Sequence, residues 1–170
     1  MMIIFVGQDA YPESSGQRFW DKQYPLSPDQ PVAFITHNNP KGNAGESLMG
    51  LLNIWNYSLP NPYSPERMEE IFNRNNILLM NSHDLNDGLN EKALIDLAKK
   101  YTEPHQFVLF GIKAQELLGK ISEIIKESKV YVVPHPSPQN ENGGYLASWE
   151  RGYRPKFTSK SVLINDIKLN

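Results

Sequence analysis

Short apolar runs that end in Gly or in polar residues recur along the chain and predict buried strands. The runs cover residues 3–6, 77–80, 107–110 and 130–133. Each is four residues long, and together they consist mainly of Ile, Leu, Val and Phe. Such runs are typical of strands that are buried on both faces of a parallel sheet. A further β-prone run, residues 32–36, lies between two loops.

Between these runs, apolar residues recur at helical spacing. A helix is expected to begin near Glu46, and Ser64 with Pro65 forms the start of another, with a Ser cap and Pro in the first turn. Asn90 and Glu91 open a helix that runs to Lys100. The helix after residue 111 is marked by Ala114, Leu117, Leu118 and Ile121, and a last one is predicted over residues 159–169.

Residues 12–31 and 37–45 are predicted to be loops, because Pro, Asn, Gly and Ser are frequent in them. The remaining elements alternate between strand and helix. This order predicts a three-layer α/β/α fold with a central four-stranded parallel sheet. No linker or repeat divides the chain, so residues 1–170 are expected to form a single domain.

Composition narrows the class of protein. Hydrophobic residues make up 39% of the chain and aromatic residues 11%, which fits a globular protein. The absence of Cys excludes disulfides and thiolate metal sites. No apolar run has the length of a membrane span, and the chain opens directly into a strand without a leader segment, so we expect a cytoplasmic protein with no membrane partner.

The net charge of −2 argues against a generally basic surface, but one basic segment is present. It contains Arg151, Arg154, Lys156 and Lys160. Phosphate contacts depend on where basic residues cluster, so this segment is a candidate nucleic-acid contact. A solvated charged stretch is the alternative.

Polar side chains of the kinds that bind ligands or catalyse reactions follow three of the predicted strands. Gln8, Asp9 and Tyr11 follow the first strand, Asn81 the second and His135 the fourth. Ligands of open parallel sheets bind beyond the carboxyl ends of the strands, so these side chains are expected to meet there.

Each of these residues also has a purely structural interpretation. Asp9 and Asn81 can cap turns, and His135 can be a hydrogen-bonded loop histidine. Phe34 can be a core residue. His37 and His83 are interpreted as loop histidines.

The order of the motifs resembles that of the main bacterial, eukaryotic and viral family of uracil-DNA glycosylases. GQDAYP is similar to that family's GQDPYH, VAFIT to LAFSV, ILLMNS to LLLNT, and VPHPSP to APHPSP. ESLMGLLNIW, FVLFGIKAQ and RGYRPKFTSKSVLI resemble three further family motifs. The likeness extends from Val6 to about Ile164.

The resemblance implies how the base is held. The enzyme extrudes a uracil nucleotide from DNA into a closed pocket. Phe34 is expected to stack on the base, and Asn81 to hydrogen-bond its polar edge. Tyr11 is expected to exclude the methyl group of thymine, and Gln8 to add contacts to the base.

The resemblance also assigns catalysis and DNA contacts. His135 is expected to donate a hydrogen bond to the oxygen that becomes negative, and Asp9 to position the attacking water. The implied partner is DNA, the protein is expected to be a monomer, and no metal or other cofactor is implied. The expected DNA contacts are Ser47, Pro136, Ser137, Arg151 and Lys160.

The chain departs from the family motifs at several positions. Ala10 and Pro12 replace a Pro and a His. Residues 139–150 are an insert where the family has a Leu that wedges into duplex DNA, although Tyr145, Leu146 or Trp149 can supply a wedge. Two alternatives follow: a glycosylase for another damaged base or for single-stranded DNA, and a catalytically silent binding protein of the same fold.

Overall fold

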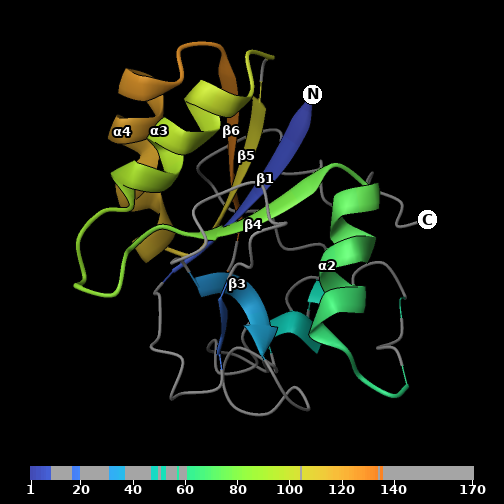
Figure 1. Ribbon diagram of the computed structural model, residues 1–170. Coiled ribbons are helices and arrows are strands. Elements are labelled where there is room, and N and C mark those ends of the chain that lie inside the picture. The colour runs from blue at the N-terminus through green and yellow to red at the C-terminus, as the bar shows by residue number, and fades with distance from the viewer. Residues whose placement is uncertain are drawn as a thin grey trace.

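The computed structural model describes residues 1–8, 17–19, 31–36, 47–49, 51–52, 57, 61–103, 105–133 and 135 (Figure 1). Residues 47–49 and 51–52 are helical. The elements in chain order are β1 (Met2–Gly7), β2 (Gln17–Phe19), β3 (Pro31–Thr36), α2 (Pro65–Arg74), β4 (Ile77–Asn81), α3 (Glu91–Lys100), β5 (His105–Phe110), the 3-10 helix η2 (Lys113–Leu117), α4 (Leu118–Ile124) and β6 (Ser128–Val133).

The main sheet has four strands in the order β4-β1-β5-β6, and all neighbouring pairs are parallel. This confirms the predicted central sheet. The chain passes from β1 to β4 on one side, and β5 then lies on the other side of β1. The strand order therefore reverses between β1 and β5, which is where open parallel sheets place their ligand sites.

Helices cover both faces of this sheet, so the fold has three layers. Figure 1 shows α3 and α4 on one face and α2 on the other. Phe5 at the centre of β1 packs edge-on against Phe72 of α2 and Phe110 of β5, with ring centroids 6.4 and 5.3 Å apart. Edge-to-face pairs of this kind add stability beyond the apolar area that they bury.

The predicted helix starts after residues 63 and 89 are confirmed. The Ser64 side chain accepts a hydrogen bond from the Arg67 amide at 3.2 Å, and Pro65 begins α2. The Asn90 side chain caps α3 by accepting from the Ala93 amide at 3.3 Å. Each cap satisfies a backbone donor that the helix itself leaves without a partner.

One predicted loop is wrong in part. Residues 17–19, expected to be loop, form β2, which pairs antiparallel with β3 in a separate two-stranded sheet. A three-residue strand carries almost no periodicity in sequence, so its pairing decides its structure. The predicted helix over 159–169 lies outside the described residues.

The segment after β5 also differs from the expected helix. It begins as the 3-10 helix η2, and Leu118, counted with the apolar residues of this helix, is 36% exposed. A 3-10 helix has three residues per turn instead of 3.6, so residues three positions apart lie on the same face. Ala114 and Leu117 therefore share the buried face, and Leu118 lies outside it.

His105 at the start of β5 is a buried histidine at the end of the sheet opposite Gly7 and Asn81. It is 1% exposed, and within the described part of the chain neither of its ring nitrogens has a hydrogen-bond partner. Tyr101 and Phe107 contact its ring edge-on. Burial lowers the pKa of His105 below its ordinary value of 6.5, because the charged ring loses its hydration.

We predict that His105 makes the fold sensitive to acid. The unfolded chain binds a proton on this ring as the pH falls through its ordinary pKa, whereas the folded protein binds it only at lower pH. The contribution of the His105 ring to the free energy of unfolding is therefore fully present above about pH 6.5, and it is lost as the pH falls below that value. In His105→Phe the free energy of unfolding, measured by urea titration between pH 7.5 and 5, should depend less on pH. An unchanged acid loss in the variant would contradict this.

Candidate functional site

The carboxyl ends of β1, β4, β5 and β6 meet at one edge of the main sheet, as predicted. Gln8 and Gly111 directly follow β1 and β5, Asn81 is the last residue of β4, and His135 is the second residue after β6. Parallel pairing fixes this arrangement, because Gly7 lies opposite Asn81 and Phe110 lies opposite Val133. Residues far apart in sequence thus form one local cluster.

Phe34 of β3 completes this cluster. Its side chain is 4% exposed, and its ring lies edge-on to Phe110 at 5.4 Å and tilted to the His135 ring at 6.2 Å between centroids. Its backbone has φ 66°, a left-handed conformation that costs a residue with a side chain about 1–2 kcal/mol. The surrounding structure must impose this conformation, and such strained residues gather at functional sites.

Gly7 allows two of these side chains to approach the backbone. A methyl group built on Gly7 would lie 3.0 Å from Asn81 Oδ1, 3.1 Å from Ala33 Cβ and 3.3 Å from Phe34 Cζ. The amide of Asn81 and the ring of Phe34 therefore both lie against the end of β1. Asn81 is 3% exposed, so its amide is held in a nearly closed environment.

Gly111 likewise allows two side chains to approach the backbone, on the other side of β1. Its φ is +88°, and a methyl group built on it would lie 2.5 Å from Gln8 Nε2 and 3.0 Å from His135 Cβ. Its amide donates to the Val133 carbonyl at 2.9 Å, which ties the end of β5 to β6. Gln8 and His135 thus lie together over a residue that has no side chain.

Two residues behind this cluster were not assigned a role from sequence. The Ser82 hydroxyl donates to the Gln8 carbonyl at 2.7 Å, and the His83 ring lies 2.9 Å from the same hydroxyl. His83 was interpreted as a loop histidine, but it is only 4% exposed and bridges to Leu89. The sequence feature that indicates a role for Ser82 and His83 is their position directly after a buried strand.

The remaining predicted site residues divide into two groups. Ser47 lies in the helical stretch 47–49 and is 2% exposed; its role as a DNA contact stays a prediction. The others lie outside the described residues: Asp9, Tyr11, Pro136, Ser137, Arg151 and Lys160. Asp9 and Pro136 are the direct sequence neighbours of Gln8 and His135.

The described cluster combines groups that can recognise a flat ring with a polar edge. Phe34 offers an aromatic face, and the Asn81 and Gln8 amides can each donate and accept hydrogen bonds. His135 adds a titratable donor or acceptor. Such a combination of an apolar surface with a few convergent polar groups is typical of small-molecule sites.

The described ranges contain neither a cluster of metal ligands nor a membrane-spanning helix. No three His, Asp or Glu side chains there gather as ligands of an ion. No helix among these residues has both the length and the apolar character needed to cross a membrane.

Comparison with known proteins adds no assignment. No protein-family model matches the chain, and no curated protein matches it significantly. A function must therefore be argued from the motifs and from the positions of their residues in the fold.

We predict that the close approach at Gly111 is required for stability. Gly111→Ala should lower the free energy of unfolding by about 1–2 kcal/mol, because a Cβ at positive φ is strained and this one also crowds His135. Urea denaturation measures the loss. Gly119→Ala is the matched control, since Gly119 lies in α4 with nothing within 4 Å of an added Cβ. The control should stabilise the protein by about 0.5–1 kcal/mol; equal effects of both substitutions would contradict the prediction.

Proposed function

We propose that this protein is a uracil-DNA glycosylase, which hydrolyses the bond between uracil and deoxyribose in DNA. One observation carries the proposal. Gln8, Phe34, Asn81 and His135 come from four separate segments, match residues of the glycosylase motifs, and lie at one edge of the sheet. Parallel pairing brings the strand ends together, but it does not decide which side chains stand there, and these four are of the types that recognition and release of a base require.

The described side chains suit recognition of uracil. The ring of Phe34 offers a stacking surface for a base that has left the helix. The Asn81 amide can donate to a uracil carbonyl and accept from the ring N–H. Cytosine reverses this pattern and would leave buried polar groups without partners, which costs about 1–3 kcal/mol for each group. The 3% exposure of Asn81 makes that cost relevant here.

In the proposed reaction the bond between C1′ and the base breaks, and its electron pair goes to uracil. His135 stabilises the resulting negative charge by donating to the base oxygen. Asp9 positions the water that adds to C1′ and balances the positive charge of the sugar. The water loses one proton as it adds, and that proton neutralises the uracil anion. No metal or other cofactor takes part in this scheme.

The proposal places the protein on DNA, as a monomer in the cytoplasm. The basic segment at residues 151–160 would contact phosphates. The insert at residues 139–150 replaces the Leu with which the family wedges into duplex DNA. Single-stranded and duplex DNA are therefore both candidate substrates.

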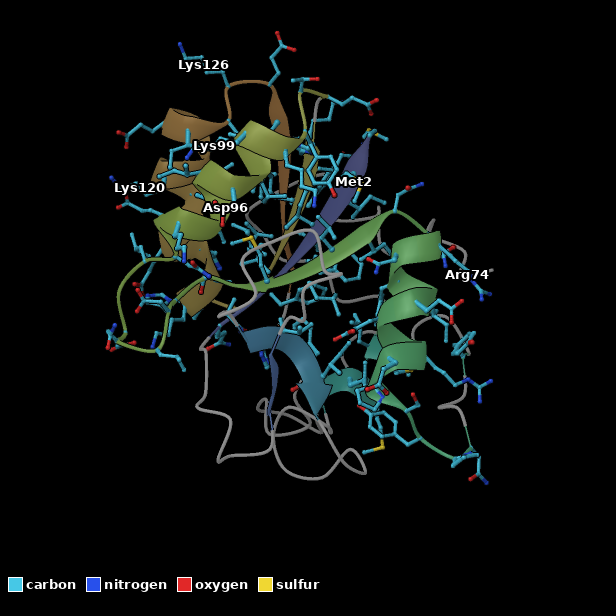
Figure 2. All side chains as sticks on the ribbon, viewed as in Figure 1. Met2, Arg74, Asp96, Lys99, Lys120 and Lys126 are labelled. Atoms are coloured by element: carbon cyan, nitrogen blue, oxygen red, sulfur yellow. The ribbon has the colours of Figure 1, made fainter. Side chains whose placement is uncertain are left out.

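We predict that the protein releases uracil from an oligonucleotide with a single uracil, and that Asp9→Asn lowers the single-turnover rate at least about 100-fold. The control is Asp96→Asn on α3, in the outer helical layer (Figure 2), which should retain the wild-type rate. Single-stranded and duplex substrates are tested in parallel. No release by a folded wild type from either would contradict the proposal and favour another damaged base or a silent binding protein.

Asn81→Asp should accept cytosine weakly, because a carboxyl group can suit the amino group of that base. The measurement is cytosine release from an oligonucleotide without uracil. Asn73→Asp, at an exposed position of α2, makes the same chemical change away from the site and should release none. Retained uracil release without any cytosine release in Asn81→Asp would remove Asn81 from base recognition.

DNA affinity should fall steeply with salt, since each phosphate contact releases counterions. Neutralising Arg151, Arg154, Lys156 and Lys160 should reduce the slope of log K against log salt by about 3. The matched control neutralises Arg74, Lys99, Lys120 and Lys126, which lie on the outer helices and the turn after α4 (Figure 2). Equal slopes for both variants would exclude the basic segment as the contact.

A further inference from the structure

The carbonyl of Gln8 is held by two hydrogen bonds from the chain that follows β4. The Ser82 hydroxyl donates to it at 2.7 Å and the His83 amide at 3.1 Å. Ser82 is fully buried. Gln8 is the residue before Asp9, so these bonds fix the point at which the chain leaves β1 towards the proposed catalytic carboxylate.

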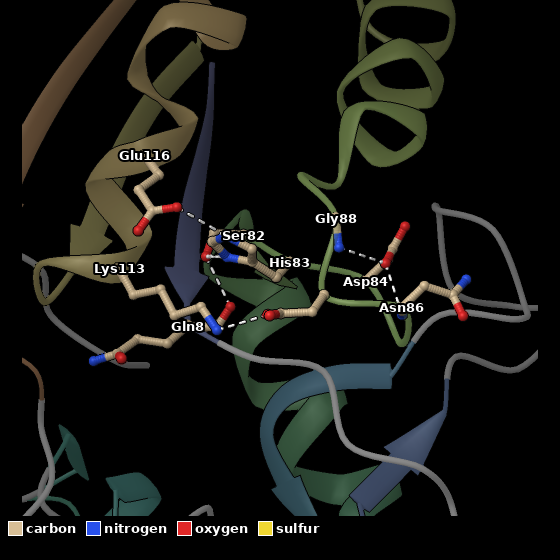
Figure 3. A network of polar contacts seen from close by, with 9 residues as sticks. Gln8, Ser82, His83, Asp84, Asn86, Gly88, Lys113 and Glu116 are labelled. Atoms are coloured by element: carbon tan, nitrogen blue, oxygen red, sulfur yellow. Dashed lines mark hydrogen bonds and ion pairs between the residues drawn. The ribbon is translucent and has the colours of Figure 1, made fainter.

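The His83 ring continues this set of contacts to the surface (Figure 3). Its Nδ1 lies 2.9 Å from Ser82 Oγ, and its Nε2 lies 3.2 Å from Glu116 Oε2 of η2. The ring is buried, whereas the Glu116 side chain is 59% exposed. A continuous path therefore connects a surface carboxylate with the Gln8 carbonyl.

The number of protons in this path decides the direction of its bonds. The Ser82 hydroxyl has one proton, and it goes to the Gln8 carbonyl, which can only accept. Ser82 Oγ must then accept from Nδ1–H of His83. The Glu116 carboxylate also only accepts, so Nε2 must carry a proton too. All the contacts are satisfied together only when both ring nitrogens are protonated.

A neutral ring has to give up one of these bonds. Glu116 favours retention of the proton on Nε2, because a carboxylate cannot donate to a bare nitrogen. Nδ1 then becomes an acceptor and takes the hydroxyl proton of Ser82. The Gln8 carbonyl loses its shorter hydrogen bond in that state.

Other charges surround the ring. In the described part of the chain they are Glu116 and Lys113 of η2, and Asp84 and Asp87 of the segment between β4 and α3. Lys113 Nζ donates to Asp87 at 2.8 Å and holds the pKa of that carboxyl below its usual range, with a smaller contribution from His83. Asp84 Oδ1 accepts from the amides of Asn86 and Gly88 (Figure 3).

We propose that His83 is a positioning residue whose protonation directs the Ser82 hydroxyl to the Gln8 carbonyl and so holds the backbone carbonyl directly before Asp9 in place. The consequence for base release rests on the proposed function. The hydrogen-bond arrangement itself does not, so the two are tested separately.

The arrangement is tested by ¹⁵N NMR of the histidine rings in the free protein from pH 5.5 to 8.5. The chain has four histidines, and His83 is assigned by its loss in His83→Asn. We expect Nδ1 to carry a proton only when Nε2 carries one too, and the neutral ring to be protonated on Nε2. Glu116→Ala should abolish the preference for Nε2, whereas Glu91→Ala, which removes a carboxylate paired with Lys120, should not. A proton on Nδ1 alone at the alkaline end would overturn the proposal.

The consequence is tested by the pH profile of single-turnover uracil release. The amide of His83→Asn can donate to Ser82 at every pH, so this variant should match the wild type where the His83 ring is doubly protonated and exceed it about 2–10-fold, the value of one hydrogen bond, where the ring is neutral. A constant ratio across the range would overturn the positioning role. If the wild type releases no uracil at all, the proposed function fails, whereas the NMR result still decides the arrangement.

Discussion

The site depends on the pairing of β1 with a strand on each side. β1 is central in the fold, and its pairing with β4 continues past the last strand residues, where the Gly7 and Gln8 carbonyls accept from the Ser82 and His83 amides. Phe5 anchors the same strand between α2 and β5. A slip of one residue would turn every side chain of β1 to the other face and separate Gln8 from Ser82. Register and core packing therefore fix the site before any polar contact does.

The site is assembled by close approach at residues without side chains. Gly7 admits the Asn81 amide and the Phe34 ring, and Gly111 admits Gln8 and His135. Phe34 is held in a left-handed backbone conformation between these groups. The left-handed backbone of Phe34 costs stability, although its ring is part of the hydrophobic core. This cost is itself an argument that the edge is functional.

The path through Ser82 and His83 adds a polar support behind this edge. Buried polar groups are costly unless all their partners are in place, and here the set is complete only for one protonation state of the ring. Glu116 is exposed, so the path connects the buried Gln8 carbonyl with a carboxylate at the surface. The support and the candidate site share one residue, Gln8, which links them physically.

The sequence by itself determined the four strands of the main sheet, the caps of α2 and α3, and the meeting of Gln8, Asn81 and His135 at one edge, because apolar runs, capping residues and parallel order are local signals. It did not show that β6 is buried only at its last two residues. Only the tertiary structure decided the rest. The pairing of Gln17–Phe19 with β3, the out-of-phase Leu118 and the left-handed Phe34 all result from contacts with distant residues. The same holds for His83, which looks like any loop histidine in sequence. Its hydrogen bonds depend on Ser82 beside it and on Glu116, 33 residues away, and no local pattern encodes that distance.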